Sequence, residues 1–409
     1  MNMRFGLAIL SALLLIVGCK EKEQTNNLSE GIWLVELDVM DNQALPFNLA
    51  VAKDGDGSYK MQIYNAEEVI DVDEIEIKGD SIRMQTPVFE GYLAGTFTEN
   101  KIQGQFIKES LDRIVPFTAV YGTEDRFSAK LEQTERNVTG IWETYFSPDL
   151  EEEYVGKGIF LQDDNKVTGT FRTTTGDYRF LEGILDGDSL KLSSFDGAHA
   201  FLFTAKVTDS SMNGVFYSGN HFKEPFVAAR NDGFELPDPD SLTFLNEGYD
   251  KLAFSFPDSD GNMISLADKK YQDKVVIVQL MGTWCPNCLD ETKFLVDYLK
   301  QDTNIEVIGL AFESAKTKEI AFKAIERLKD RVAVNYPILL AQFGSYDKKE
   351  AQEKLPMLNH ILSYPTTIFI DKKGDVRKIH TGFNGPATGE KYVEFKKGFN
   401  ALITQLSNE

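Results

Sequence analysis

Two of the three cysteines in this 409-residue sequence lie close together, in the motif Cys285-Pro286-Asn287-Cys288. An apolar run at 274–280 ends just before them, and leucines with helical spacing follow. A cysteine at a helix N-terminus is favoured as the thiolate, because the helix dipole and free amide groups stabilise the negative charge, and only the thiolate attacks disulfides. The motif therefore predicts thiol–disulfide exchange, with Cys285 as the nucleophile and Cys288 as the less exposed, resolving thiol.

A structural zinc site is the main alternative for such a pair, and it would need further ligands. No other cysteine occurs after residue 249, and the histidines there, His360 and His380, lie far apart in the sequence. A copper-chaperone site is also disfavoured, because such sites resemble Cys-x-x-x-Cys with a histidine. We therefore expect neither a metal nor an organic cofactor, and the redox group would be the Cys285–Cys288 disulfide itself.

Strands that alternate with helices are expected to hold this motif in place. The run at 274–280 has the pattern of a buried strand, and 306–312 repeats that pattern after a helix. A further helix, a hairpin at 367–376 and an amphipathic helix ending near 406 complete the region. The order is a βαβ half followed by a ββα half, which predicts an α/β domain.

The segment Met281–Cys288, together with Tyr364-Pro365-Thr366-Thr367 downstream, resembles the thioredoxin superfamily. In particular it resembles the TlpA/ResA-like membrane-tethered, extracytoplasmic thiol–disulfide oxidoreductases. The resemblance covers residues 249–409 and implies that Pro365 is a cis proline packed beside the cysteines. It also implies that Tyr364 offers backbone groups to a substrate strand, although a tyrosine is larger than the residues common at this position.

The resemblance implies further site residues. Glu291 matches a glutamate that such proteins place near the cysteine pair, where it can tune the thiol pKa and relay a proton. A solvated charge on the helix is the alternative for Glu291, and Glu313 is a second candidate of the same kind. The substrate contacts implied by the resemblance are Trp284, Pro286, Tyr364 and Thr366.

The N-terminus has the pattern of a bacterial lipoprotein signal. Arg4 precedes an apolar run at 5–17, which is shorter than the roughly 20 residues of a membrane-spanning helix. Gly18 then precedes Cys19, which resembles a lipobox, so Cys19 is expected to become the lipid-carrying N-terminus. An ordinary secretory signal with an unmodified cysteine is the alternative.

An internal repeat occupies the first half of the sequence. Gly31-Ile32-Trp33 recurs as Gly140-Ile141-Trp142, and three further matches follow in the same order at offsets of 108 to 110 residues. Apolar residues alternate with polar ones within each copy, and turn signals separate the short runs. This predicts two duplicated antiparallel barrels or sandwiches of about eight strands each.

The aromatic residues of these repeats could line a ligand cavity, but they are better explained as barrel core. They are Trp33, Tyr92, Phe106, Trp142, Phe160, Phe171, Phe180 and Phe216. The linker that follows combines two prolines with several acids, so we expect it to be extended and exposed.

The predicted fold class is multidomain, with two antiparallel all-β modules followed by an α/β thioredoxin-like domain. The divisions are a signal peptide at 1–18, a polar leader at 19–29, β module 1 at 30–123, β module 2 at 138–231, a linker at 232–248 and the thioredoxin-like domain at 249–409.

Charge and compartment limit the partners. The 64 acidic side chains against 43 basic ones give a net charge of −21, which opposes a nucleic-acid partner. A lipid anchor would place the chain in the cell envelope, facing the periplasm or exposed at the surface. A reductase there works against an oxidising environment, so it needs a membrane thiol–disulfide electron donor.

The leading hypothesis is a lipid-anchored reductant of protein disulfides, with the haem-site thiols of apocytochromes among the candidate substrates. A disulfide oxidase or isomerase is the alternative within the same chemistry. In a different class, the β modules would have the main role, by binding a ligand or a protein.

Overall fold

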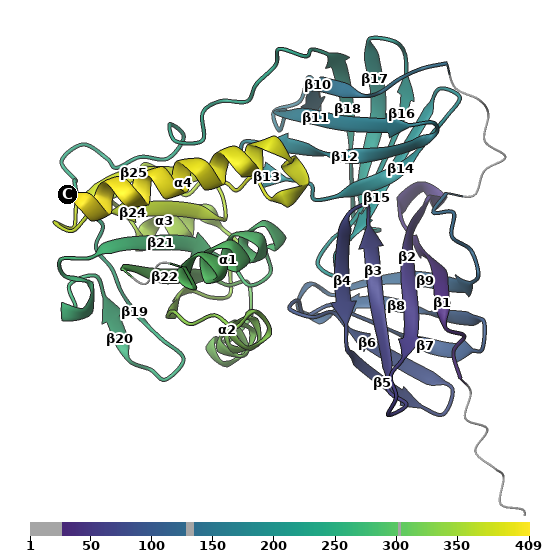
Figure 1. The fold of residues 1–409 in the computed structure, drawn as a ribbon, viewed down its shortest axis with the longest axis horizontal. Helices are drawn as coiled ribbons and strands as arrows, with labels where there is room; N and C mark the ends of the chain where they lie inside the picture. The colour runs from purple at the N-terminus through teal and green to yellow at the C-terminus, as the bar shows by residue number, and fades with distance from the viewer. Residues whose placement is uncertain (1–26, 128–134, 302–303) are drawn as a thin grey trace, which may run out of the picture.

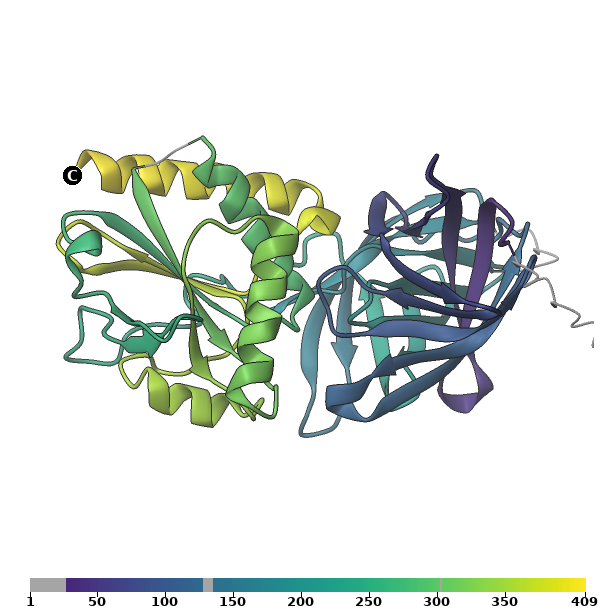
Figure 2. The same cartoon turned by 90° about the horizontal axis from the view of Figure 1, so that it is seen from below.

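The computed structural model describes residues 27–127, 135–301 and 304–409. Two β modules form a column, and an α/β domain stands beside it, as Figure 1 shows. A view from below shows the same two halves in contact along one side (Figure 2). The predicted signal peptide and Cys19 lie outside the described residues, so lipidation of Cys19 stays a prediction. In the described part of the chain, no helix combines the length and the apolar character needed to cross a membrane.

β module 1 is one curled antiparallel sheet in the order β4-β3-β2-β1-β9-β8-β7-β6-β5. Its strands are β1 (Gly31–Asp38), β2 (Ala44–Lys53), β3 (Tyr59–Asn65), β4 (Glu68–Val72), β5 (Glu74–Lys78), β6 (Ser81–Gln85), β7 (Tyr92–Thr98), β8 (Lys101–Lys108) and β9 (Arg113–Tyr121). Short 3-10 helices η1 (Met40–Asn42) and η2 (Glu109–Leu111) interrupt the meander.

β module 2 has the order β11-β10-β18-β17-β16-β15-β14-β12-β13, and pairing of β11 with β12 closes it into a barrel. Its strands are β10 (Gly140–Phe146), β11 (Tyr154–Asp163), β12 (Lys166–Thr173), β13 (Gly176–Asp177), β14 (Leu181–Asp186), β15 (Ser189–Phe195), β16 (Ala200–Val207), β17 (Ser211–Ser218) and β18 (Phe222–Arg230). The expectation of two antiparallel modules, each a barrel or sandwich of about eight strands, is confirmed, with nine strands in each sheet.

The two modules repeat the same local construction at the predicted offset. The indole N–H of Trp33 donates to the carbonyl of Ser29 at 3.0 Å, and that of Trp142 donates to Val138 at 2.8 Å. Both tryptophans are fully buried. An identical contact at an offset of 109 residues supports the duplication that the sequence pattern predicts.

Most of the repeat's aromatic side chains fill the barrels. Tyr92 and Phe180 are half-buried. The buried ones are Trp33, Phe106, Trp142, Phe160, Phe171 and Phe216.

Phe195 joins the two modules, because it projects from β15 into the core of β module 1. Its ring stacks on Phe47 at 4.4 Å and meets Phe106 edge-on at 5.0 Å. Its backbone N–H donates to the side-chain oxygen of Asn65 at 3.1 Å, and its carbonyl accepts from the side-chain amide of the same residue at 2.9 Å. The two modules therefore share a core.

The thioredoxin-like domain is a five-stranded sheet in the order β23-β22-β21-β24-β25, with β24 antiparallel to β21. Its elements are β21 (Val275–Met281), α1 (Pro286–Leu299), β22 (Ile305–Phe312), α2 (Lys318–Val332), β23 (Ile338–Gln342), α3 (Lys348–Lys354), β24 (Thr366–Ile370), β25 (Val376–Thr381) and α4 (Glu390–Asn408). A hairpin of β19 (Ser255–Pro257) and β20 (Met263–Ser265) precedes them, with η3 (Lys269–Tyr271), and η4 (Pro386–Thr388) precedes α4.

Both faces of this sheet are covered, as a sheet with buried parallel strands requires. Helices α1, α2 and α4 pack on one face, and α3 packs on the other with the segment around Phe254. Consecutive residues of β21 alternate between these two cores, and every one of them is buried. The central strand therefore holds its C-terminal end, where the cysteine motif begins, in a fixed position.

The linker is mostly exposed, as predicted: seven of residues 231–240 are exposed, and none of them lies in a helix or strand. Ion pairs also hold two of its acids against both neighbours. Glu235 pairs with Lys157 at 2.9 Å and with Arg172 at 3.0 Å in β module 2. Asp240 lies 2.7 Å from Nδ1 of His380 in the thioredoxin-like domain.

Candidate active site

The cysteine motif spans the junction between β21 and α1. Cys285 caps the helix with an extended backbone, and its Sγ accepts from the backbone N–H of Cys288 at 3.2 Å. Pro286 occupies the first helical turn, where its missing N–H costs nothing. The two cysteines form a disulfide, with Cys285 6% exposed and Cys288 fully buried.

Gly282 allows the turn before the cysteines to close. A Cβ at this position would lie 2.4 Å from the indole Nε1 of Trp284. That indole donates to the carbonyl of Phe312 at 3.0 Å, which fixes the half-buried ring beside the motif. The turn therefore positions Trp284 next to Cys285.

The segment before β24 lies against the redox pair. The Tyr364–Pro365 peptide bond is cis, and the carbonyl oxygen of Tyr364 lies 3.4 Å from Sγ of Cys285. Trp284 meets the ring of Tyr364 edge-on at 5.9 Å. Thr366 is fully buried and donates to the carbonyl of Ser363 at 2.8 Å. Its side chain therefore supports this loop from the inside and does not face the substrate.

Glu291 is buried behind the cysteines, so the alternative of a solvated helix charge is wrong. The side-chain amide of Gln279 donates to its carboxylate at 2.9 Å and to the carbonyl of Cys288 at 3.4 Å, and Thr367 also donates to the carboxylate. Burial raises the pKa of Glu291 to about 6, although these hydrogen bonds oppose that shift. The carboxyl is therefore suited to exchange a proton near neutral pH.

Glu313 supports the turn that carries Trp284. It accepts from the backbone N–H of Thr283 at 2.8 Å and from the hydroxyl of Thr283 at 2.7 Å. Burial raises the pKa of Glu313 to about 7, against the effect of both hydrogen bonds. The carboxyl therefore has a structural position, with its ionised form disfavoured.

Glu313→Gln is expected to make the free energy of unfolding of the protein less sensitive to rising pH. A carboxyl whose pKa is raised by folding contributes stability below its unfolded pKa, and loses that contribution as the pH rises through the folded value. The window for Glu313 is therefore pH 4.5 to about 7. Above it, the variant should gain up to about 3 kcal/mol in its free energy of unfolding, while near pH 4.5 the two proteins should match.

Urea unfolding across pH 4.5 to 8 measures this difference. Glu350→Gln, at an exposed position of α3, is the matched control and should leave the profile unchanged. If the free energy of unfolding changes with pH in the same way in the wild type and in Glu313→Gln, the prediction is contradicted.

β module 2 contacts the active-site face directly. The side-chain amide of Asn287, between the two cysteines, donates to the carbonyl of Asp177 at 3.2 Å. The carboxylate of Asp177 accepts from the backbone N–H of Gly385 at 2.8 Å. Burial raises the pKa of Asp177 to about 6, although the nearby Arg179 lowers it.

A buried ion cluster joins all three parts of the chain. Arg179 of β module 2 pairs with Asp290 of α1 and with Glu68 of β module 1, and lies 3.7 Å from Asp196. It also donates to the carbonyl of Pro286 at 3.3 Å. Burial alone would lower the pKa of Arg179, but the surrounding carboxylates raise it, so the guanidinium is held charged.

No sequence motif marks Arg179, Asp177 or Asp290 as site residues. The contacts between β module 2 and α1 join residues more than 100 positions apart, so no local sequence pattern predicts them.

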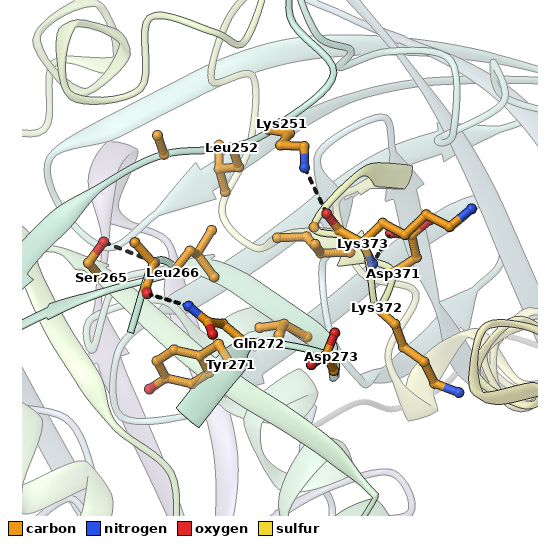
Figure 3. A pocket seen from close by; sticks show the side chains of 15 residues that line it. Lys251, Leu252, Ser265, Leu266, Tyr271, Gln272, Asp273, Asp371, Lys372 and Lys373 are labelled. Atoms are coloured by element: carbon orange, nitrogen blue, oxygen red, sulfur yellow. Dashed lines mark hydrogen bonds between the residues drawn. The ribbon is translucent and has the colours of Figure 1, made fainter. Parts of the chain in front are cut away.

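A cavity of about 400 Å³ adjoins Cys285, between the cysteine motif and β module 2. A second cavity of about 380 Å³ lies on the other side of Trp284, between the thioredoxin-like domain and the β6–β7 loop of β module 1. Figure 3 shows a third, of about 510 Å³, lined by Lys251, Tyr271 and Asp371. The third cavity lies at the opposite end of β21 from the cysteines, so the redox chemistry is not performed there.

Comparisons with known proteins agree with this geometry. The model of the AhpC/TSA family matches residues 249–379. Thioredoxin-like protein YneN of Bacillus subtilis (strain 168) is 30% identical over 139 residues, which cover 34% of this chain and 73% of that protein. Thiol-disulfide oxidoreductase ResA of the same organism is 27% identical over 142 residues, covering 34% of this chain and 69% of ResA.

A solved thiol-disulfide oxidoreductase from Bacteroides fragilis NCTC 9343 is 19% identical, with a TM-score of 0.27, and the match covers 36% of this chain and 99% of that one. The range that the family model matches contains β21, the cysteine pair and the cis proline. The chain therefore belongs to the thioredoxin-like family of YneN and ResA, and its C-terminal third is a thiol–disulfide oxidoreductase domain with the redox pair Cys285–Cys288.

Proposed function

We propose that this protein is a lipid-anchored reductase of protein disulfides that works outside the cytoplasm. The observation that carries the proposal is the position of the Cys285–Cys288 pair, at the N-terminus of α1 and beside the cis bond of Pro365. One thiol of the pair adjoins a cavity and the other is fully buried. This is the asymmetry that an attacking and a resolving thiol need.

The thiolate of Cys285 attacks one sulfur of the substrate disulfide. The substrate S–S bond breaks, a mixed disulfide forms, and the first substrate sulfur leaves as a thiolate that takes up a proton. The thiolate of Cys288 then attacks Sγ of Cys285, which forms the intramolecular disulfide and releases the second substrate sulfur. Two electrons pass from the pair to the substrate, and a dithiol donor must return them.

The buried carboxyl of Glu291 supports proton transfer in the second step. Gln279 donates both to this carboxyl and to the carbonyl of Cys288, so the acid and the resolving cysteine share a neighbour. With its pKa raised to about 6 by burial, Glu291 can take the proton of the Cys288 thiol as that thiol becomes a nucleophile. The cis loop supplies the backbone carbonyl of Tyr364 to the substrate side of Cys285.

The surroundings of Cys288 favour the reducing direction. This thiol is fully buried in the apolar core under α1, and burial disfavours a thiolate. A buried resolving thiol adds no stabilised thiolate to the reduced pair beyond that of Cys285, and this favours the disulfide, whereas a strong oxidant stabilises its reduced form.

The anchor and the electron donor complete the proposal. The lipobox-like segment ending at Cys19 supports lipidation, and the polar leader at 19–29 supports attachment at a distance from the membrane. A membrane thiol–disulfide protein that reduces Cys285–Cys288 is the partner that the chemistry requires.

The reduction potential of the pair tests the direction. We expect a value near −270 mV, at the reducing end of the range, when the full chain with Cys19→Ser is equilibrated against defined thiol buffers. The double variant Cys285→Ser/Cys288→Ser should show no transition. A value near −120 mV would overturn the reductase and make disulfide formation or isomerisation the better assignment.

A further inference from the structure

β module 2 covers the face of the thioredoxin-like domain that carries the redox pair. Cys285 is 6% exposed. The turn between β12 and β13 lies across this face, where the hydroxyl of Ser363 donates to the carbonyl of Thr175 at 2.7 Å. On the other side of the motif, Asn287 donates to Asp177 at 3.2 Å. A partner that approaches Cys285 must therefore pass beside this turn.

The cavity of about 400 Å³ is the space that remains next to Cys285, and its walls come from both parts of the chain. Trp284, Cys285 and Tyr364 form the wall on the thioredoxin-like domain. Tyr178 and Phe201 of β module 2 line the cavity from the other side, with their rings 5.4 Å apart.

The side chains of this second wall are held by β module 2 itself. The hydroxyl of Tyr178 lies 2.7 Å from that of Tyr154, which in turn donates to Glu224 at 2.6 Å. The ring of His199 stacks on Phe201 at 4.5 Å. Thr175, at the turn, is exposed and marks the side on which the cavity meets solvent.

We propose that this cavity is the substrate site, that β module 2 supplies its second wall, and that the site accepts a disulfide on a narrow, flexible peptide segment and excludes one on the surface of a folded protein. The proposal rests on the proposed function and specifies its substrate. A cavity of about 400 Å³ lies in the range that holds small ligands. A folded partner would have to bring its disulfide past the β12–β13 turn, which is held against Ser363 and Asn287 on either side of the 6% exposed Cys285.

The chemistry of the walls fits such a segment. Aromatic rings on both walls suit a sulfur-containing side chain, because sulfur packs favourably against ring edges. The carbonyl of Tyr364 is available to an extended backbone on one side. A free low-molecular-weight disulfide shares this chemistry, so the test must separate it from a peptide.

Three disulfides that carry the same leaving group provide the test. They are glutathione disulfide, glutathione linked to a cysteine in an unstructured peptide, and glutathione linked to a surface cysteine of a folded carrier protein. The reduced full chain with Cys19→Ser is mixed with each, and the oxidation rate of its cysteine pair is measured. We expect the first two to react at similar rates and the carrier at least about tenfold more slowly.

Each outcome has a distinct meaning. If the carrier reacts as fast as the peptide, β module 2 does not restrict access to Cys285, and the proposal is overturned. The proposed reductase function would be unaffected by that result. A peptide as slow as the carrier would overturn the peptide assignment in favour of free small disulfides. Failure of all three to oxidise the pair would instead overturn the proposed function.

Gly176→Val tests the wall within the full chain. Gly176 has a φ of +144°, and a Cβ there would lie 2.0 Å from Nδ2 of Asn287, so a valine must displace the Asn287 side chain, break its hydrogen bond to Asp177 and thereby loosen the turn from the motif. We expect the rate difference between peptide and carrier to shrink at least about tenfold. Gly122→Val is the matched control, since its φ is +83° with no neighbour within 4 Å of the added Cβ, and it should leave the difference unchanged.

A measurement on the wild-type fold covers the case in which Gly176→Val does not fold. The reduced chain with Cys19→Ser is alkylated with iodoacetamide, and with a small maleimide and the same maleimide attached to a large polymer. We expect the polymer to slow the maleimide reaction at Cys285 by at least about tenfold, with iodoacetamide confirming that the thiol is reactive. Equal rates for the two maleimides would overturn the proposal.

Discussion

Cys285→Ser is expected to abolish disulfide exchange by this protein, with a fall in rate of at least about 10³-fold. A serine hydroxyl at this position stays protonated near neutral pH and cannot form a mixed disulfide. The rest of the site would persist, because the pocket residues and the cis loop are held by contacts that do not involve Sγ of Cys285. The measurement is the rate of reduction of glutathione disulfide with an excess of an external dithiol.

Cys288→Ser is the matched control for this loss. Cys285 still attacks in this variant, but no second thiol of the chain resolves the product. When the reduced variant is mixed with glutathione disulfide without the external dithiol, it should therefore accumulate a mixed disulfide that mass spectrometry detects on Cys285. Turnover by Cys285→Ser comparable to that of the wild type, in a chain confirmed to be folded, would contradict the assignment of Cys285 as the nucleophile.

Arg179→Ala is expected to destabilise the protein by about 3–5 kcal/mol, since removing one partner of a buried ion cluster leaves uncompensated charge. The guanidinium is the cation that Asp290 and Glu68 contact, and all three side chains are largely buried. The three belong to three different parts of the chain. The loss should therefore appear as an early transition in urea unfolding, with Cys285 becoming accessible to the large maleimide.

Lys206→Ala is the control for Arg179→Ala, because it removes one partner of an exposed pair. Lys206 and Asp188 lie 2.7 Å apart, with side chains 69% and 53% exposed. Solvent screens such exposed pairs, so they contribute little to stability. An effect of Arg179→Ala as small as that of Lys206→Ala would contradict a stabilising role for the cluster.

The sequence was sufficient to predict the redox domain, because its signals are local. The buried strand β21, the helix start at Pro286 and the cysteine spacing all occur within about 15 consecutive residues. Periodic alternation likewise predicted the two β modules. The edge strand β23 was not predicted. Five buried residues in a row, flanked by irregular segments, do not distinguish a strand from a short buried helix.

The contacts between the modules could not be predicted from the sequence. Thr175, Asp177 and Arg179 belong to an ordinary hairpin in their own surroundings. Only the folded chain places Thr175 against Ser363, and Asp177 and Arg179 against residues 286 to 290. The same holds for the ion pairs of the linker. Its acids and prolines correctly indicate exposure, but the cations that pair with Glu235 and the histidine that pairs with Asp240 lie far away in the sequence.

The bond from Asn287 to Asp177 links docking of β module 2 to the redox state of the motif it touches. Docking and reduction form a closed thermodynamic cycle. Any difference in docking free energy between the oxidised and reduced chain must equal the difference in reduction free energy between the docked and undocked chain. Each ~1.4 kcal/mol of that difference moves the potential by about 30 mV. β module 2 is in this sense a tethered ligand of the redox pair, and a potential measured on the whole chain includes its contribution.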